Sequence, residues 1–291
     1  MVAALLAADI TADGSAEMRD RFDYSRVPDR SPPGIPILSE AISLLTRRGA
    51  YEGDYLREFL YEELKQLGVT TFGDLRRTDR QADKSLEPYQ RYKLVVMATD
   101  VTRGRLLRLP WDYHLLHLDP DEQLVADAVR ASVSIPLYFE PAVVRDGATG
   151  EHTTLVDGGV LSNFPIEIFD RTDSKRPRWP TLGVKIIPEL PAGDAQLFPD
   201  IALPRIPPVH LLEQVVATAI VGNDQTYLER PCVRRRAIQV DTSAIGVVEF
   251  DASEEQRATV AGNGYRAAER FLAEWDWERY KRDCRGVPVE A

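Results

Sequence analysis

The residues with the clearest chemical potential are an aspartate and two glycines near the middle of the chain: Asp157, Gly158 and Gly159. The apolar stretch 153–156 precedes them and predicts a buried strand that ends at the carboxylate. In open α/β sheets, ligands and catalytic groups collect at the carboxyl ends of strands. Glycines lack a Cβ, so they let the backbone turn sharply and let a substrate approach it. The pattern therefore predicts Asp157 as a general base, supported by Gly158 and Gly159.

A second interpretation of the same residues is a hairpin turn. Asp-Gly is a frequent turn dipeptide between two strands, and in a turn the carboxylate of Asp157 would have no catalytic role. The dipeptide alone does not separate the two interpretations. The flanking segments 130–136 and 163–165, taken together with it, favour the catalytic interpretation.

Two histidines are spaced so that they could bind a metal ion. His114 and His117 are three residues apart, and Asp119 follows them. A zinc site needs three or four ligands, and no further cluster of such residues lies nearby. We therefore expect a surface or half-buried pair of histidines and predict no metal site.

Three other charged positions have a structural and a functional interpretation. The run 234–236 is three arginines, which could contact lipid head groups but is more often a solvated face or a strand edge. Asp100 also ends a predicted strand, and we expect it to hold a loop by hydrogen bonds. Arg130 could pair with a carboxylate near the site, although a structural ion pair is the default expectation.

The composition excludes several classes of protein. The net charge of -10 over 291 residues argues against non-specific binding of nucleic acid, which needs a basic surface. Cys232 and Cys284 are the two cysteines, too few and too far apart to predict a disulfide framework, so a cytoplasmic protein is expected. Peripheral membrane contact is the alternative, and no apolar run approaches the roughly 20 residues of a transmembrane helix.

The pattern of apolar residues predicts a single α/β domain over residues 1–291, with a mostly parallel central sheet. Helical spacing with few polar residues at 2–8 predicts a helix that is buried on all sides. A polar connection with prolines at 11–38 predicts an exposed loop. Strands are predicted at 92–100, 105–110 (an edge strand), 181–187 and 236–241, helices at 40–47, 53–67, 121–132, 210–228 and 253–275, and a second loop at 188–208.

Several segments occur together in this chain, in an order and at spacings that are specific. They are 130–136, Phe139, Pro141, 156–159 and 163–165, with support from 98–100, 264–265 and 271–272. Together they resemble the patatin-like phospholipases, which are lipid acyl hydrolases with a three-layer α/β/α fold. This resemblance implies a Ser-Asp dyad, with Asp157 as its acid, that cleaves a lipid or other carboxylic ester without a cofactor. A dyad also suits a chain with only four histidines.

One part of the family pattern is missing from this sequence. The family's serine lies in a G-x-S-x-G elbow, and no such motif or glycine-rich oxyanion loop is present. Residues 1–8 resemble the helix that follows that serine. The resemblance therefore implies a domain truncated at its N-terminus, without its first strands and nucleophile, and inactive as given. The alternative, from a different class, is a non-catalytic remnant that binds a lipid or a partner protein.

Overall fold

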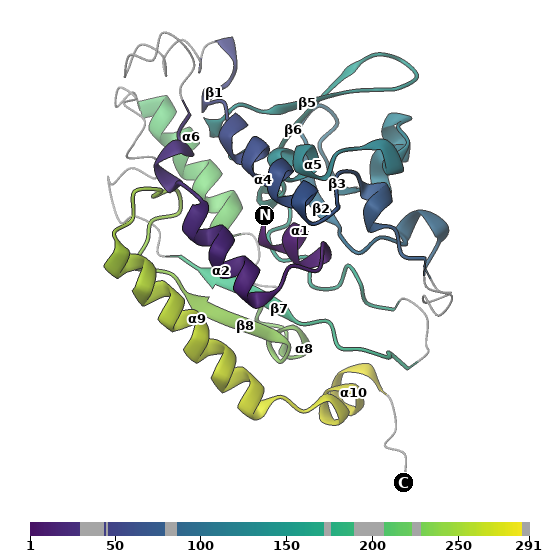
Figure 1. Cartoon of the computed structure of the whole chain (residues 1–291), viewed down its shortest axis with the longest axis vertical. Coiled ribbons are helices and arrows are strands. Elements are labelled where there is room, and N and C mark those ends of the chain that lie inside the picture. Colours follow the sequence, from purple (N-terminus) through teal and green to yellow (C-terminus); the bar gives the residue numbers. More distant parts are fainter. Residues whose placement is uncertain are drawn as a thin grey trace. The chain divides into compact units, whose positions relative to one another are not determined.

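The computed structural model describes residues 1–29, 44, 46–78, 86–171, 176–188, 207–222 and 228–286 (Figure 1). The chain divides into two compact units. The first comprises Met1–Leu161 and Phe198–Val216, and the second comprises Ser162–Leu197 and Ala217–Ala291. The predicted helix at 40–47 and loop at 188–208 lie almost entirely outside the described residues. The prediction of a single domain stays a prediction.

The first unit contains a four-stranded sheet in which every pairing is antiparallel. The strand order is β3-β2-β6-β5, so the predicted edge strand is confirmed as β3. The expectation of a mostly parallel sheet is wrong for this sheet, because short connections join β2 to β3 and β5 to β6, and such hairpins pair antiparallel. The strands are β2 (Val96–Asp100), β3 (Arg105–Leu109), β5 (Ala142–Arg145) and β6 (His152–Asp157).

Parallel pairs occur in both units, and the predicted α/β class is confirmed. In the first unit β1 (Gly49–Tyr51) pairs in parallel with β4 (Leu137–Phe139). In the second unit β7 (Gly183–Ile187) pairs in parallel with β8 (Ala237–Asp241), at two of the predicted strand positions.

Helices pack on the sheet of the first unit. Helix α5 contacts β2 and β6, and it also contacts α4, which in turn contacts α1. In the described part of the chain, short 3-10 helices lie in the connections, at Tyr24–Arg26, Phe72–Leu75, Pro88–Gln90, Trp111–Leu116, Pro120–Glu122 and Gly158–Val160. The α-helices are α1 (Val2–Ala7), α2 (Ala12–Arg21), α4 (Asp54–Gln66), α5 (Val125–Ser132) and α6 (Pro207–Ala217), the last followed by a π-helical turn, Thr218–Gly222.

Two predictions for the N-terminal region need correction. Helix α1 is not buried on all sides: Val2 and Leu6 are 58% and 60% exposed, because a helix of this length turns only one face to the core. The predicted loop at 11–38 contains helix α2. The hydroxyl of Thr11 starts this helix by accepting the N–H of Gly14 at 3.0 Å, a typical N-cap.

In the second unit a long helix packs against the parallel strand pair. Helix α9 (Glu254–Glu274) contacts β8 along its length (Figure 1). Two shorter helices, α8 (Pro231–Arg234) and α10 (Trp277–Arg285), contact each other. No helix among the described residues is long and apolar enough to cross a membrane.

A disulfide bond joins α8 to α10. The Cα atoms of Cys232 and Cys284 are 5.5 Å apart and their sulfurs are bonded. The sequence does not predict this single disulfide, because two cysteines 52 residues apart in sequence come together only when the two helices pack against each other. The predicted cytoplasmic localisation loses this support and stays a prediction.

Candidate active site

Asp157 is the last residue of β6, at a position fixed by main-chain hydrogen bonds. It lies opposite Ala98 of β2, and its N–H donates to the carbonyl oxygen of Ser134 at 2.9 Å. Since β6 lies between β2 and β5, the strand has a neighbour on each side. The aspartate is therefore held on a rigid part of the first unit.

Among the described residues, the carboxylate of Asp157 has one hydrogen-bond partner. Its Oδ1 atom accepts the N–H of Gly159 at 2.6 Å, which makes Asp157 the N-cap of the following 3-10 helix. No hydrogen bond to Oδ2 is found among the described residues, and this oxygen remains an available acceptor. The chain enters a helical turn here and does not fold back as a hairpin, so the hairpin interpretation of Asp157-Gly158 is wrong.

Burial changes the acidity of this carboxyl group. The side chain lies in a poorly solvated environment that disfavours its charged form, and this raises the pKa of Asp157 to about 6. The hydrogen bond from Gly159 acts in the opposite direction, because it stabilises the carboxylate. A carboxyl group with this pKa is ionised at neutral pH and still basic enough to accept a proton.

The two glycines have separate roles. Gly158 lies against β2 so closely that a Cβ would be 2.4 Å from the carbonyl oxygen of Met97, and no larger residue fits there without a shift of the strand. Gly159 is buried and supplies the N–H that orients the carboxylate. The structure thus brings together the three predicted site residues, Asp157, Gly158 and Gly159.

Ser134 and Arg130 support the site in a way that the sequence does not reveal. The hydroxyl of the fully buried Ser134 donates to the carbonyl oxygen of Arg130 at 2.9 Å and accepts from its Nη1 atom at 2.6 Å. The hydroxyl proton of Ser134 is therefore already engaged. The i, i+4 spacing of the two residues is the only signal in the sequence, and it is a weak one.

Among the residues that the structure describes, Arg130 has no ion pair of the predicted kind. Its Nη2 atom donates to the carbonyl oxygen of Glu140 at 3.0 Å and to that of Glu52. Burial lowers the pKa of this guanidinium. The arginine thus connects the segments at the ends of β1 and β4, which is a structural role.

Asp100 holds a turn, as predicted. Its completely buried carboxylate accepts the N–H groups of Thr102 and Arg103 at 3.0 and 3.1 Å, and the Nε of Arg105 at 3.0 Å. These bonds fix the connection between β2 and β3. In the antiparallel pairing Asp100 lies opposite Leu155, and Asp157 lies opposite Ala98.

The two histidines have different partners. Nδ1 of His114 is 2.7 Å from the carbonyl oxygen of Trp111, whereas Nδ1 of His117 is 3.0 Å from a carboxylate oxygen of Asp146. Within the described ranges, no group of three or more histidine, cysteine or acidic side chains is placed to hold a metal ion.

The arginine run 234–236 does not form one charged face. Arg236 is buried and donates to Asp170 at 2.7 Å, while Arg235 donates to Asp283 at 2.6 Å. Arg234 is exposed. The expectation of a solvated face is wrong for Arg236, because the acidic Asp170 makes its burial possible.

The sequence is similar to proteins of bacteria. It is 34% identical over 189 residues to the uncharacterized protein YqhO of Bacillus subtilis (strain 168), an alignment that covers 65% of this chain and 58% of YqhO. It is 32% identical over 136 residues to the RpoH suppressor of Rhizobium meliloti (strain 1021), with coverage of 40% of this chain and 21% of that protein. The chain thus spans less than two thirds of each of these relatives.

A model of the patatin-like phospholipase family matches residues 1–170, which is more than half of the chain. The matched segment includes the four-stranded sheet and the strand end that carries Asp157. The chain therefore belongs to the patatin-like phospholipase family.

Proposed function

We propose that Asp157 is the acid of a Ser-Asp dyad in a lipid acyl hydrolase that acts on carboxylic esters. One observation carries this proposal: a poorly solvated carboxyl group with a pKa of about 6 stands at a strand end and has one oxygen available. General bases work best when their pKa lies near the operating pH. Membership in a family of phospholipases makes a lipid ester the expected substrate.

The chemistry follows from the two oxygens of the carboxylate. Oδ1 is occupied by the N–H of Gly159, so Oδ2 is the atom that would accept the proton of a serine hydroxyl. The serine oxygen would then attack the ester carbonyl, and Asp157 would return the proton to the departing alcohol. Water would release the acyl group by the same route in reverse. No cofactor is needed for these steps.

We further propose that this sequence does not supply the nucleophile and that the 291-residue chain alone is inactive. The sequence has no G-x-S-x-G motif, and the hydroxyl of Ser134 is engaged with Arg130. Turnover of an activated ester by the 291-residue chain tests this proposal: no turnover above background is expected, and turnover would disprove it.

Activity assays test the role of Asp157 directly. In a longer protein that also supplies the nucleophile serine, Asp157→Asn should lower turnover of an activated ester by about 100-fold to 10,000-fold, the range for loss of a general base. Asp20→Asn is the matched control, because Asp20 is exposed and, among the described residues, pairs with the adjacent Arg19 alone. Equal activity of the Asp157→Asn and Asp20→Asn proteins would exclude Asp157 as the base.

A second candidate function is lipid binding without catalysis. Its supporting observation is the exposed apolar face of α6, where Leu211, Leu212 and Val215 are accessible to solvent. Such a face would suit peripheral contact with a membrane. Leu212→Glu should abolish co-sedimentation with lipid vesicles, whereas Leu272→Glu, which alters an exposed leucine on α9, should not. Equal sedimentation of the two variants would disprove contact through α6.

A further inference from the structure

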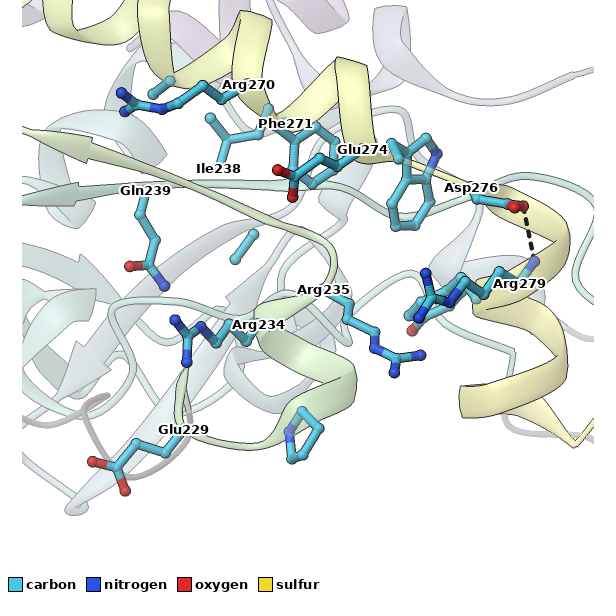
Figure 2. Close-up of a pocket in the computed structure, with 15 residues that line it drawn as sticks. Glu229, Arg234, Arg235, Ile238, Gln239, Arg270, Phe271, Glu274, Asp276 and Arg279 are labelled. Atoms are coloured by element: carbon cyan, nitrogen blue, oxygen red, sulfur yellow. Dashed lines mark hydrogen bonds between the residues drawn. The ribbon is translucent and has the colours of Figure 1, made fainter.

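A cavity of about 940 Å³ lies in the second unit, outside the segment that the family model matches. All of its lining residues fall between positions 229 and 280. Its walls come from α8, the first residues of β8, the last turns of α9, and α10 (Figure 2). Small-molecule sites in proteins enclose about 300–1,000 Å³, so this cavity has room for a ligand.

One wall of the cavity carries a surplus of positive charge. Arg234, Arg235 and Arg279 line it, from α8, the residue after α8, and α10. Arg235 and Arg279 share a single carboxylate, that of Asp283, at 2.6 and 3.7 Å. Arg234 has no ion pair or hydrogen bond from its side chain among the described residues, and it is exposed. The exposed Glu229 also lines the cavity but forms no ion pair with these arginines.

The opposite wall is aromatic and carries Glu274, and Arg270, one turn before Glu274 on α9, also lines the cavity. Phe271 and Trp275 stack with their ring centroids 5.4 Å apart, and Tyr280 lies 5.4 Å from Trp275. Figure 2 shows Glu274 and Phe271 on the side of the cavity away from Arg234 and Arg235. Glu274 is exposed and makes no ion pair within the described part of the chain. Asp276 is different, because its carboxylate accepts the N–H of Arg279 and thereby caps α10.

The two walls call for opposite charges in one ligand. Guanidinium groups that converge from two helices suit a phosphate, which offers several acceptor oxygens to their planar forks. Aromatic faces beside a carboxylate suit an ammonium group, which is attracted to the rings and to the charge. A simple anion would meet repulsion from Glu274, and a simple cation would meet repulsion from the arginines.

We propose that this cavity binds a zwitterionic phosphoester, with its phosphate against Arg234, Arg235 and Arg279 and its ammonium group against Trp275 and Glu274. The site does not use Asp157. If the cavity binds no zwitterion, the proposed dyad is unaffected. If Asp157 proves not to be a catalytic base, binding of the zwitterion in the cavity is unaffected.

Isothermal titration calorimetry of the full chain tests this assignment with phosphocholine, inorganic phosphate and choline as separate probes. Phosphocholine should bind at least about tenfold more tightly than either of its parts, because only it engages both walls. Equal affinity for all three probes, or no binding of phosphocholine, would overturn the assignment.

Variants identify the residues. Arg234→Gln should weaken phosphocholine binding by about tenfold or more, the effect of losing one charge-assisted hydrogen bond. Trp275→Leu should weaken phosphocholine binding but leave phosphate binding unchanged. The matched control is Arg266→Gln, which removes an exposed arginine from α9 outside the cavity. Equal affinity of the Arg234→Gln and control proteins, with unchanged thermal unfolding, would contradict the site.

Vesicles distinguish the two sources of this chemistry. If the ligand is a lipid head group, the chain should co-sediment with phosphatidylcholine vesicles, and Arg234→Gln should reduce that binding. If the ligand is a free phosphoester, soluble phosphocholine should bind without any binding to vesicles. Both results support the site, and the absence of binding in both assays overturns it.

Discussion

At the level of single residues, the carboxyl group of Asp157 experiences two opposing effects on its pKa. Burial raises the pKa to about 6, and the N–H of Gly159 partly offsets this increase. The folded protein therefore holds this proton more tightly than the unfolded chain, in which the pKa of an aspartate is about 3.9. Ionisation of Asp157 consequently destabilises the folded state.

This difference predicts how stability depends on pH. The stabilisation that the protonated Asp157 gives the folded state should be fully present below about pH 4. It should be lost between about pH 4 and 6, so that the free energy of unfolding falls by at most about 3 kcal/mol in total. Asp157→Asn cannot ionise, so its stability relative to the parent protein should increase across this window. Urea unfolding at pH 4, 5, 6 and 7.5 measures this difference, and a constant difference would contradict the raised pKa.

The close approach of Gly158 to β2 predicts a steric effect. Gly158→Ala would place a Cβ 2.4 Å from the carbonyl oxygen of Met97 and should destabilise the protein by about 1–3 kcal/mol. Gly264→Ala is the matched control. It lies inside α9 with its nearest neighbour at 3.8 Å, and it should stabilise the helix by about 0.5–1 kcal/mol. Thermal unfolding would show shifts of opposite sign, and equal shifts would contradict the close contact.

The sequence identifies site residues better than it identifies their supports. Asp157 could be predicted because an acid and two glycines after an apolar stretch form a local pattern. Asp100 also ends an apolar stretch, yet its carboxylate already accepts hydrogen bonds from Thr102, Arg103 and Arg105. The bond from Asp157 to Ser134 could not be predicted, since it depends on where the loop after α5 passes β6.

At the level of secondary structure, the positions of strands could be predicted more readily than their directions. Apolar runs rich in β-branched residues marked β2, β7 and β8, but such runs do not encode whether a neighbour is parallel. The short connections 101–104 and 146–151 produce the antiparallel hairpins. The pattern of apolar residues does not predict helix α2, because its residues are mostly polar. The N-cap residue Thr11 is the feature of the sequence that indicates where this helix begins.

The disulfide between α8 and α10 gives a prediction for the second unit. Helix α8 has four residues and is too short to be stable alone, so we expect the bond to hold it in place. Cys232→Ser should destabilise this unit by about 4 kcal/mol in the chain-entropy description of a 52-residue loop. Reductant should lower the Tm of the parent protein and leave that of Cys232→Ser unchanged, and an unchanged parent Tm would contradict the expectation.

At the level of the whole molecule, the family match and the ligand site belong to different segments. Residues 1–170 match the family and include Asp157, whereas the proposed zwitterion site uses residues after 228. The aligned regions cover 58% of YqhO and 21% of the RpoH suppressor. The hydrolase activity of the whole protein is therefore a proposal.

The central claim is that Asp157 is a general base whose nucleophile this sequence does not supply. Covalent labelling by a serine-directed phosphonate tests it most directly, with the 291-residue chain and with a longer protein that supplies the nucleophile serine. We predict no labelling of the 291-residue chain, labelling of the longer protein, and loss of that labelling when the longer protein carries Asp157→Asn. Labelling of the 291-residue chain, or labelling of the longer protein that Asp157→Asn leaves unchanged, would contradict the claim.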